Sequence, residues 1–263
     1  MIEALFLYAG LGIFAGIIAG FLGVGGGLII VPVLVAIFQG QGFDTNSLMH
    51  LAIGTSLATI VFTSISSVYA HHRRGAVLWP VFWKMTSGIV AGALLGAVIA
   101  DLVPGDQLRM VFGVFELIVA AYMAWNVIPS PHRDLPGQIL LTITGMLIGV
   151  VSSVIGIGGG TMTVPFLIWC NVSISKAVAT SSACGLPIAL AGATGFMMTG
   201  WSEPTLPEWS TGYIYWPSFF GIIATSIVFA PVGARLTHVL PVMVTKRFFA
   251  LFLGMLGIHM LTG

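Results

Sequence analysis

The segment Gly20-Phe-Leu-Gly-Val-Gly-Gly-Gly-Leu-Ile-Ile-Val-Pro32 has a second copy 133 residues further along the chain, and this repetition is the main evidence for the fold. The second copy reads Ser153-Val-Ile-Gly-Ile-Gly-Gly-Gly-Thr-Met-Thr-Val-Pro165. Both copies place three consecutive glycines between apolar runs and end in Val-Pro. A match of this length indicates a tandem duplication of one structural unit. We therefore divide the chain into two repeats, 1–130 and 131–263.

Two further matches extend the duplication along the chain. Ala52-Ile-Gly-Thr-Ser56 corresponds to Ala177-Val-Ala-Thr-Ser181, at an offset of 125 residues. Trp79-Pro80 corresponds to Trp216-Pro217, at an offset of 137 residues. The matching positions span most of both halves, so the repeat covers several segments.

The composition places the chain in a membrane. Of its 263 residues, 57% are hydrophobic and only 6% are charged, and the mean hydropathy is +1.06. Too few charges remain to cover the surface of a soluble protein. A net charge of +1 also excludes a nucleic-acid-binding protein, which needs a basic surface. The length allows roughly eight to ten membrane-spanning segments.

Breaks at glycines, prolines and charge clusters divide the chain into helices. The first apolar run is interpreted as a membrane helix because no basic segment precedes it. Cys170 and Cys184 lie in apolar stretches and indicate neither a disulfide framework nor a metal site. We predict an all-α polytopic membrane protein with helices at Ala4–Leu22, Leu28–Phe38, Met49–Ala70, Trp79–Ala100, Leu108–Ile128, Ile139–Ile155, Thr161–Cys170, Ala177–Met198, Tyr213–Ala234 and Pro241–Leu261.

The charges favour inverted repeats over parallel ones. If each Gly-rich segment turns the chain back as a hairpin, the two halves have opposite orientations, and the basic residues collect on one side. That side then holds Arg73, Arg74, Lys84, Arg133, Lys176, Arg235, Lys246 and Arg247, and only Arg109 lies opposite. The positive-inside rule makes this side cytoplasmic and places both termini outside the cytoplasm. Each repeat then holds a Gly-rich broken-helix hairpin plus three transmembrane helices.

The two Gly-rich segments are the first candidate for a substrate site. Each precedes a short helix whose start carries free N–H donors and partial positive charge. Two such starts near the membrane midplane would bind an anion without a buried cation. The alternative is that the glycines only let helices pack closely. The candidate residues are Gly25, Gly26, Gly27, Gly158, Gly159, Gly160 and Thr161.

Paired hydroxyls are the second candidate for a substrate site. Thr55 and Ser56 match Thr180 and Ser181, and Ser182 follows. Their hydroxyls would donate hydrogen bonds to an anion while keeping the site neutral. The alternative is that they bond to carbonyl groups of their own helices.

Three ionisable residues are candidates for coupling or for substrate access. Glu116 lies in the middle of a predicted helix, where it would carry a proton, or else stay neutral and bond between helices. His50 and Lys176 precede the two Thr-Ser segments, and we expect them at opposite mouths of the site, where they would attract anions. Their alternative role is that of ordinary helix-end residues near lipid headgroups.

The doubled Gly-rich motif resembles that of the TauE/SafE sulfite exporter family, also grouped as sulfonate-uptake permeases. The Ala-x-x-Thr-Ser segments and the late Gly96-Ala97 and Gly233-Ala234 pairs extend the resemblance over nearly the whole chain. The resemblance implies a permease for sulfite, organosulfonates or related sulfur oxyanions, usually acting outward across a bacterial inner membrane. It implies no cofactor.

Together these features predict a permease that works by alternating access around a midplane site. The membrane potential favours anion exit, so export needs little coupling, whereas uptake would need co-transported protons or sodium. A passive small-anion channel is the alternative. An intramembrane enzyme is not indicated, because no metal-binding or catalytic set of residues appears at membrane depth. The expected partners are the anion and membrane lipid, without nucleic acid, and oligomerisation stays open.

Overall fold

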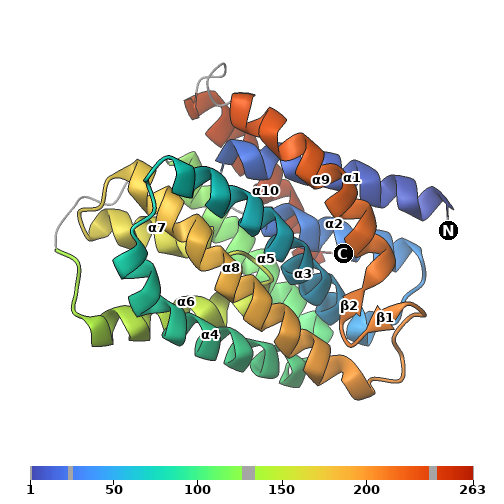
Figure 1. The fold of residues 1–263 in the computed structure, drawn as a ribbon. Coiled ribbons are helices and arrows are strands. Elements are labelled where there is room, and N and C mark those ends of the chain that lie inside the picture. Colours follow the sequence, from blue (N-terminus) through green and yellow to red (C-terminus); the bar gives the residue numbers. More distant parts are fainter. Residues whose placement is uncertain (1, 23–25, 126–133, 237–241, 263) are drawn as a thin grey trace.

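The computed structural model describes residues 2–22, 26–125, 134–236 and 242–262, and most of these are helical (Figure 1). In chain order the elements are α1 (Ile2–Leu22), α2 (Gly27–Gly40), α3 (Thr45–Arg73), α4 (Trp79–Leu102), α5 (Gly105–Ala124), α6 (Gln138–Ile155), α7 (Gly160–Trp169), α8 (Ile174–Thr199), a 3-10 turn η1 (Gly200–Ser202), β1 (Ser210–Thr211), β2 (Ile214–Tyr215), α9 (Trp216–Leu236) and α10 (Val242–Thr262). Five of these helices, α3 to α6 and α8, are long and apolar enough to cross a membrane. The prediction of an all-α polytopic membrane protein is confirmed.

The helix bounds follow the predicted ones closely, with two informative differences. Helix α3 begins at Thr45, earlier than predicted, because the Asp44 side chain caps it by accepting a hydrogen bond from Asn46 N at 2.9 Å. Helix α9 begins later than predicted, because residues 210–215 form an antiparallel ribbon of β1 and β2. The ends of two predicted helices, near Ile128 and Pro241, lie outside the described residues.

Helices α2 and α7 are shorter than a membrane crossing. They hold 14 and 10 residues, which correspond to roughly 21 and 15 Å, against a hydrocarbon layer of about 30 Å. Helix α2 packs on α3, and α7 packs on α8. Each short helix therefore runs beside the helix that follows it.

The helices of one repeat pair mainly with those of the other. Helix α4 packs along α6, α1 along α9, α3 along α8 and α5 along α10. In the repeat, α1 to α5 are equivalent to α6 to α10 in order. Exchanging equivalent helices turns the α4–α6 pair into the α9–α1 pair. The same exchange leaves the α3–α8 pair and the α5–α10 pair unchanged. Exchange of this kind is the contact pattern that a two-fold rotation between the halves produces.

Glycines set the distance between α4 and α6. A Cβ atom added to Gly92 would meet the backbone of Met146, and one added to Gly96 would lie 2.6 Å from Val150 O. Thr142 Oγ1 also donates to Lys84 O at 2.8 Å. Residue numbers rise together along the two helices, so α4 and α6 run parallel, and these glycines serve close packing as small residues do in membranes.

Helices α3 and α8 form the centre of the molecule and run antiparallel (Figure 1). The Cβ position of Gly192 lies 2.9 Å from Leu57 Cδ1, and that of Gly185 lies 3.3 Å from Ser64 Oγ. Residue numbers thus rise on α3 while they fall on α8. Every residue of α3 from Ser47 to Ile60 is buried, so this pair is the core around which the other helices pack.

The charged residues separate to the two ends of the helices. We call the end that holds the start of α3 and the start of α5 the acidic end, and the opposite end the basic end. Among the described residues, the exceptions are Arg109 at the acidic end, Asp134 at the basic end and Glu116 inside α5. The acidic end carries Asp44, Asp101, Asp106, Glu203 and Glu208, and the basic end carries Arg73, Arg74, Lys84, Lys176 and Arg247.

Candidate functional site

The two Gly-rich turns start α2 and α7 in the same way. Gly26 precedes α2 with φ 76°, and Gly159 precedes α7 with φ 73°. This left-handed conformation costs a side-chain-bearing residue energy that glycine does not pay. The two glycines occupy equivalent positions of the repeat, whereas Gly25 lies outside the described residues.

The starts of α2 and α7 have no side-chain cap among the described residues. Ile29 N and Ile30 N bond to Gly26 O, and Met162 N and Thr163 N bond to Gly159 O, at 2.9–3.2 Å. These bonds leave the first amides of each helix for another acceptor. The partial positive charge of a helix start adds to the attraction for an anion.

The two Gly-rich turns meet in the core. A Cβ atom on Gly27 would lie 2.5 Å from Gly156 O and 3.0 Å from Ile157 Cα. From α3, Ser56 Oγ donates to Gly156 O at 3.0 Å. From α8, the Cβ position of Gly185 lies 2.8 Å from Gly158 O. The structure therefore brings both turns together against the central α3–α8 pair.

Thr55 and Thr180 link the two halves reciprocally. Thr55 Oγ1 accepts a hydrogen bond from Tyr215 N, and Thr180 Oγ1 accepts one from Leu78 N, both at 3.0 Å. Leu78 and Tyr215 directly precede α4 and α9, at equivalent positions of the repeat. Each hydroxyl therefore satisfies an amide at a helix start in the other half, and it keeps its own proton for a further bond.

The register of α3 and α8 separates these two threonines. Gly192 on α8 lies opposite Leu57 on α3, and Gly185 lies opposite Ser64. In this register, the α3 position opposite Thr180 is about 14 residues beyond Thr55. At a rise of about 1.5 Å per residue, this is roughly 21 Å along the helix. The structure does not bring Thr55 and Thr180 into one binding site.

The three serines of the paired segments make different contacts. Ser182 Oγ bonds to Val178 O at 3.0 Å, in its own helix. Ser181 Oγ is buried and has no hydrogen-bond partner among the described residues. Its equivalent, Ser56, donates to Gly156, and the equivalent of Gly156 is Gly23, which lies outside the described residues.

A group of hydroxyls surrounds the second Gly-rich turn. The hydroxyls of Ser152, Ser153, Thr161 and Thr163 are buried, with no partner in the part of the chain that the structure describes. Ser152 and Ser153 end α6, and both threonines lie in the first turn of α7. Of these four residues, only Thr161 was predicted from the sequence as a site residue. The signal that it missed was the presence of hydroxyl residues where the first repeat has apolar ones or glycine.

Glu116 is fully buried on α5, with an exposure of 0%. Neither carboxyl oxygen has a hydrogen-bond partner within the described residues. It belongs to the buried face of α5 that also holds Phe112 and Val119. An ionised carboxylate without a partner in such surroundings costs far more than a protonated one, so the environment favours the neutral acid.

His50 lies at the acidic end, where it is buried between residues of the first and the second repeat. Its Nε2 lies 3.0 Å from Ala100 O and its Nδ1 3.2 Å from Asn46 O, and its ring stacks on Tyr213 at 5.0 Å. Burial, with help from the nearby Asp101 carboxylate, raises the pKa of the Tyr213 hydroxyl. Tyr213 thus stays protonated and donates to Asp101 Oδ1 at 3.0 Å.

Lys176 lies in the first turn of α8 at the basic end and is exposed. It and His50 therefore lie at opposite ends of the molecule, and neither lies beside the Gly-rich turns. Glu116 is also absent from the contacts of the described parts of those turns.

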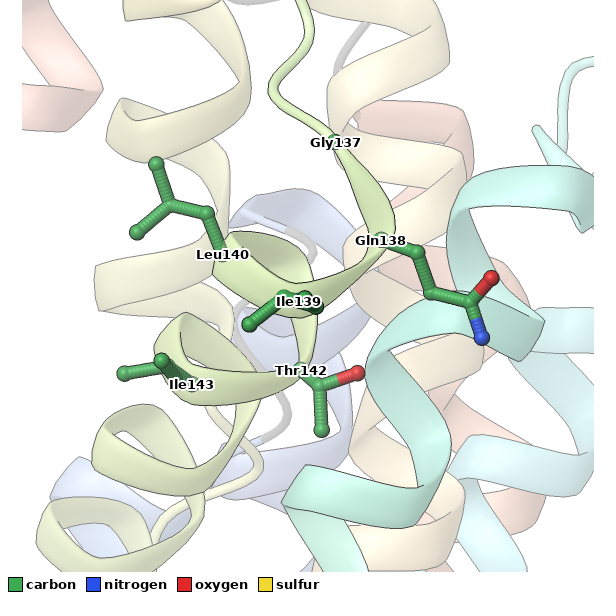
Figure 2. Close-up of a pocket in the computed structure, with 6 residues that line it drawn as sticks. All are labelled: Gly137, Gln138, Ile139, Leu140, Thr142 and Ile143. Carbon is green, nitrogen blue, oxygen red and sulfur yellow. The ribbon is translucent and has the colours of Figure 1, made fainter.

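Two cavities lie away from the Gly-rich turns. One, of about 290 Å³, lies at the acidic end and is lined by Asn46, Ser47, His50, Asp101, Leu102, Val103, Pro104, Gly105, Glu203 and Tyr213. The other, of about 780 Å³, lies at the start of α6 and is lined by Gly137, Gln138, Ile139, Leu140, Thr142 and Ile143 (Figure 2). Ile139 in this second cavity is 79% exposed, so it faces the surroundings of the molecule.

A metal centre has no support in the described residues, where no three His, Cys, Asp or Glu side chains lie close enough to bind one ion. The two cysteines, Cys170 and Cys184, are both buried and free, as the sequence predicts.

Comparison with known proteins identifies a family and several relatives. The family model described as "Sulfite exporter TauE/SafE" matches residues 8–260. A probable membrane transporter protein of Haemophilus influenzae is 38% identical over 254 residues, which cover 95% of each chain. A probable membrane transporter protein of Bacillus subtilis is 26% identical over 245 residues, or 90% of this chain and 91% of that one. No solved structure matches the chain.

Proposed function

The chain belongs to the TauE/SafE sulfite exporter family of membrane transporters, and on that premise we propose that it carries sulfite or an organosulfonate across a bacterial inner membrane. We propose export by alternating access around a site at the centre of the molecule. The membrane potential favours exit of an anion by about 2.3 kcal/mol per charge for each 100 mV. Export therefore needs little coupling, and the proposed mechanism includes no enzymatic step and no cofactor.

The observation that carries this proposal is the meeting of the two Gly-rich turns beside α3 and α8. Two uncapped helix starts lie there, and no Lys or Arg is buried among the described residues, as a neutral site for an anion requires. The proposed substrate-binding residues are Gly25, Gly26, Gly27, Gly158, Gly159, Gly160, Thr161, Ser56, Ser181 and Ser182. Thr55 and Thr180, which the sequence also predicts, lie roughly 21 Å apart along α3, so we do not propose that both contact one bound anion. Two members of the proposed set, Ser56 and Ser181, are buried, and this burial supports a place for them near the turns.

The proposed architecture is a pair of inverted repeats, 1–130 and 131–263. Its support is that the central helices α3 and α8 are antiparallel, whereas α4 and α6 are parallel. If each Gly-rich segment merely interrupted one continuous crossing, α3 and α8 would be parallel. The positive-inside rule then assigns the basic end to the cytoplasm and both termini to the outer side.

We propose a carrier rather than a passive anion channel, and the burial of the described turn residues supports this choice. Glu116 is proposed as a proton carrier because it is buried without a partner. His50 and Lys176 are proposed to attract the anion at the two ends.

Counterflow in liposomes tests the proposal. Purified protein is reconstituted with internal sulfite, and uptake of labelled sulfite is measured, with thiosulfate, taurine, sulfoacetate and chloride as competitors. A carrier gives uptake that unlabelled internal sulfite accelerates, and sulfur anions compete better than chloride. A passive channel gives flux without this acceleration. If folded protein moves no sulfur anion, the proposed substrate is wrong.

A pair of double variants locates the site. Gly26→Leu with Gly159→Leu fills both helix starts, and we expect counterflow to be abolished. Gly10→Leu with Gly137→Leu is the control, because both glycines have open space around their Cβ positions. Size-exclusion chromatography checks that each variant is folded. Equal loss of counterflow in both folded variants would contradict a site at the turns.

A further inference from the structure

The ring of His50 lies between two carbonyl oxygens. Its Nε2 is 3.0 Å from Ala100 O, in the last turn of α4, and its Nδ1 is 3.2 Å from Asn46 O, one turn earlier on α3. A carbonyl oxygen only accepts hydrogen bonds, so each ring nitrogen needs a proton to bond here. A neutral imidazole has one N–H group and would turn the lone pair of its other nitrogen toward an oxygen. Only the imidazolium ion satisfies both contacts.

The surroundings of His50 supply negative charge for an imidazolium ion. The residue is only 4% exposed, so an uncompensated charge would be costly there. The carboxyl groups of Asp101 and Glu203 line the same cavity as His50, and the last turn of α4 carries the partial negative charge of a helix end. The titratable groups at this end are these two carboxyl groups and Tyr213 around the cavity, with Asp44 before α3 and Asp106 in the first turn of α5.

His50 belongs to a set of contacts that joins four elements at the acidic end. From α3, its ring bonds to Ala100 of α4 and stacks on the ring of Tyr213, with centroids 5.0 Å apart. Tyr213 lies between β1 and β2 and donates from its hydroxyl to Asp101 Oδ1 at 3.0 Å. Its backbone N–H donates to Phe196 O of α8 at 3.2 Å. The acidic end is thus closed by α3, α4, the ribbon and α8 around one buried ring.

The matching position of the second repeat holds a different residue. The offset of 125 residues between the two Thr-Ser segments matches His50 with Ser175, in the first turn of α8 at the basic end. Ser175 is exposed, whereas His50 is buried. A serine hydroxyl carries no positive charge, and histidine is the side chain whose charge changes near neutral pH. The duplication therefore keeps the hydroxyls of both Thr-Ser segments but places a titrating group before only one of them.

We propose that His50 is a protonated latch, which keeps the outer mouth of the carrier closed by tying α3 to the end of α4. When the imidazolium ion loses a proton to the outer solution, one of its two hydrogen bonds is lost and the mouth opens more easily. The closure is therefore strongest at low outer pH and weakens as that pH rises. His50 is a positioning residue, because both of its N–H groups are occupied and only its charge is left to attract an anion. The opening role rests on the alternating access of the proposed function, whereas the charge of His50 does not.

Nitrogen NMR of the full protein in detergent tests the charge. With histidine labelled by nitrogen-15, an imidazolium ion gives two ring nitrogens of similar chemical shift, whereas a neutral ring gives one N–H nitrogen and one bare nitrogen with well separated shifts. His50→Gln identifies the signal by its loss, and we expect the imidazolium pattern at about pH 7. His259→Gln is the control, because His259 is an exposed histidine of the same end, and this change should leave the His50 signal in place.

Alkylation at position 47 tests the closure. Ser47 lines the cavity and is 4% exposed, so Ser47→Cys in a Cys170→Ala, Cys184→Ala background should react slowly with a maleimide in detergent. Glutamine offers one donor group, as a neutral imidazole does. Adding His50→Gln should therefore raise the rate roughly tenfold or more at about pH 6, the usual gain from freeing a hydrogen bond to a charged group. The difference between the two variants should shrink as the pH rises to about 9, since His50 then loses its second proton.

Two controls separate opening from a general loss of structure. Each comparison is made at one pH, so thiol ionisation by the buffer affects both variants alike. Glu208→Cys, at an exposed position of the same end, should react equally fast with and without His50→Gln. Adding His259→Gln to Ser47→Cys should leave the rate unchanged at both pH values. Size-exclusion chromatography checks that each variant is folded.

The outcomes separate this inference from the proposed function. A neutral ring at His50, or a rate that His50→Gln raises equally at both pH values or not at all, overturns the latch. If counterflow occurs and the latch is overturned, the proposed function stands without it. If the ring is charged and the closure follows the pH as expected, but folded protein shows no counterflow, the transport proposal is wrong while the pH-dependent closure stands.

Discussion

Gly159 holds a conformation that other residues avoid, with φ 73° at the start of α7. Gly159→Ala should lower the free energy of unfolding by about 1–2 kcal/mol from the left-handed backbone alone. The added Cβ would also meet the tip of Ile188. Thermal unfolding in detergent measures the loss. Gly137→Ala is the control, because Gly137 has φ −62° and open space, and an unchanged midpoint for Gly159→Ala would contradict the assignment.

Glu116 should tolerate replacement by the neutral residue glutamine. Because its two oxygens have no described partner and its exposure is 0%, we expect the neutral acid. Glu116→Gln should therefore keep the thermal midpoint, and it should remove any dependence of counterflow on a pH gradient if Glu116 carries the proton. A thermal midpoint that falls sharply in Glu116→Gln would show that the carboxyl group has a partner and acts structurally.

At the scale of the elements, the two reciprocal threonine hydrogen bonds should contribute equally to the free energy of unfolding. Thr55→Val leaves Tyr215 N without its acceptor, and Thr180→Val does the same to Leu78 N. Each change should cost about 1–3 kcal/mol, the usual penalty for an unsatisfied buried donor. Because the two sites are far apart, the double variant should lose the sum. Denaturation of the single and double variants measures this, and Thr194→Val provides the control.

The sequence predicts the elements better than it predicts their contacts. Hydropathy and the breakers Gly and Pro locate the ten α-helices of the described residues. The predicted helix that starts at Trp79 also starts there in the structure. The ribbon at residues 210–215 escapes prediction because it depends on positive φ at Trp209 and Gly212. Such local backbone choices leave little trace in hydropathy.

The candidate site was predictable in its glycines and less so in its hydroxyls. Gly26 and Gly159 stand out because three adjacent glycines between apolar runs occur at matching positions of the two repeats. Thr55 and Thr180 match in sequence, but their separation follows from the register of α3 against α8, which repeats do not reveal. Ser152 and Thr163 become visible only when burial shows that their hydroxyls lack partners.

For the whole molecule, the separation of charge predicts how the protein lies in the membrane. Arg74 at the basic end and Glu208 at the acidic end are both exposed. In a Cys170→Ala, Cys184→Ala background, Glu208→Cys should react with a membrane-impermeant maleimide added to intact spheroplasts. Arg74→Cys should react only after the membrane is opened. The reverse pattern would contradict the positive-inside assignment.

The pairing of α1 with α9 has a consequence for how the protein is made. Thr225 Oγ1 donates to Ala9 O across 216 residues, whereas in the corresponding α4–α6 pair Thr142 Oγ1 donates to Lys84 O across 58. At a synthesis rate of about 5–20 residues per second, α1 waits roughly 10–40 s for its partner, and α4 waits only about 3–12 s. Among these helix pairs, α1 therefore waits longest for its partner. During that interval its Gly12 and Gly16 face, which later fits against α9, is open to membrane chaperones and proteases.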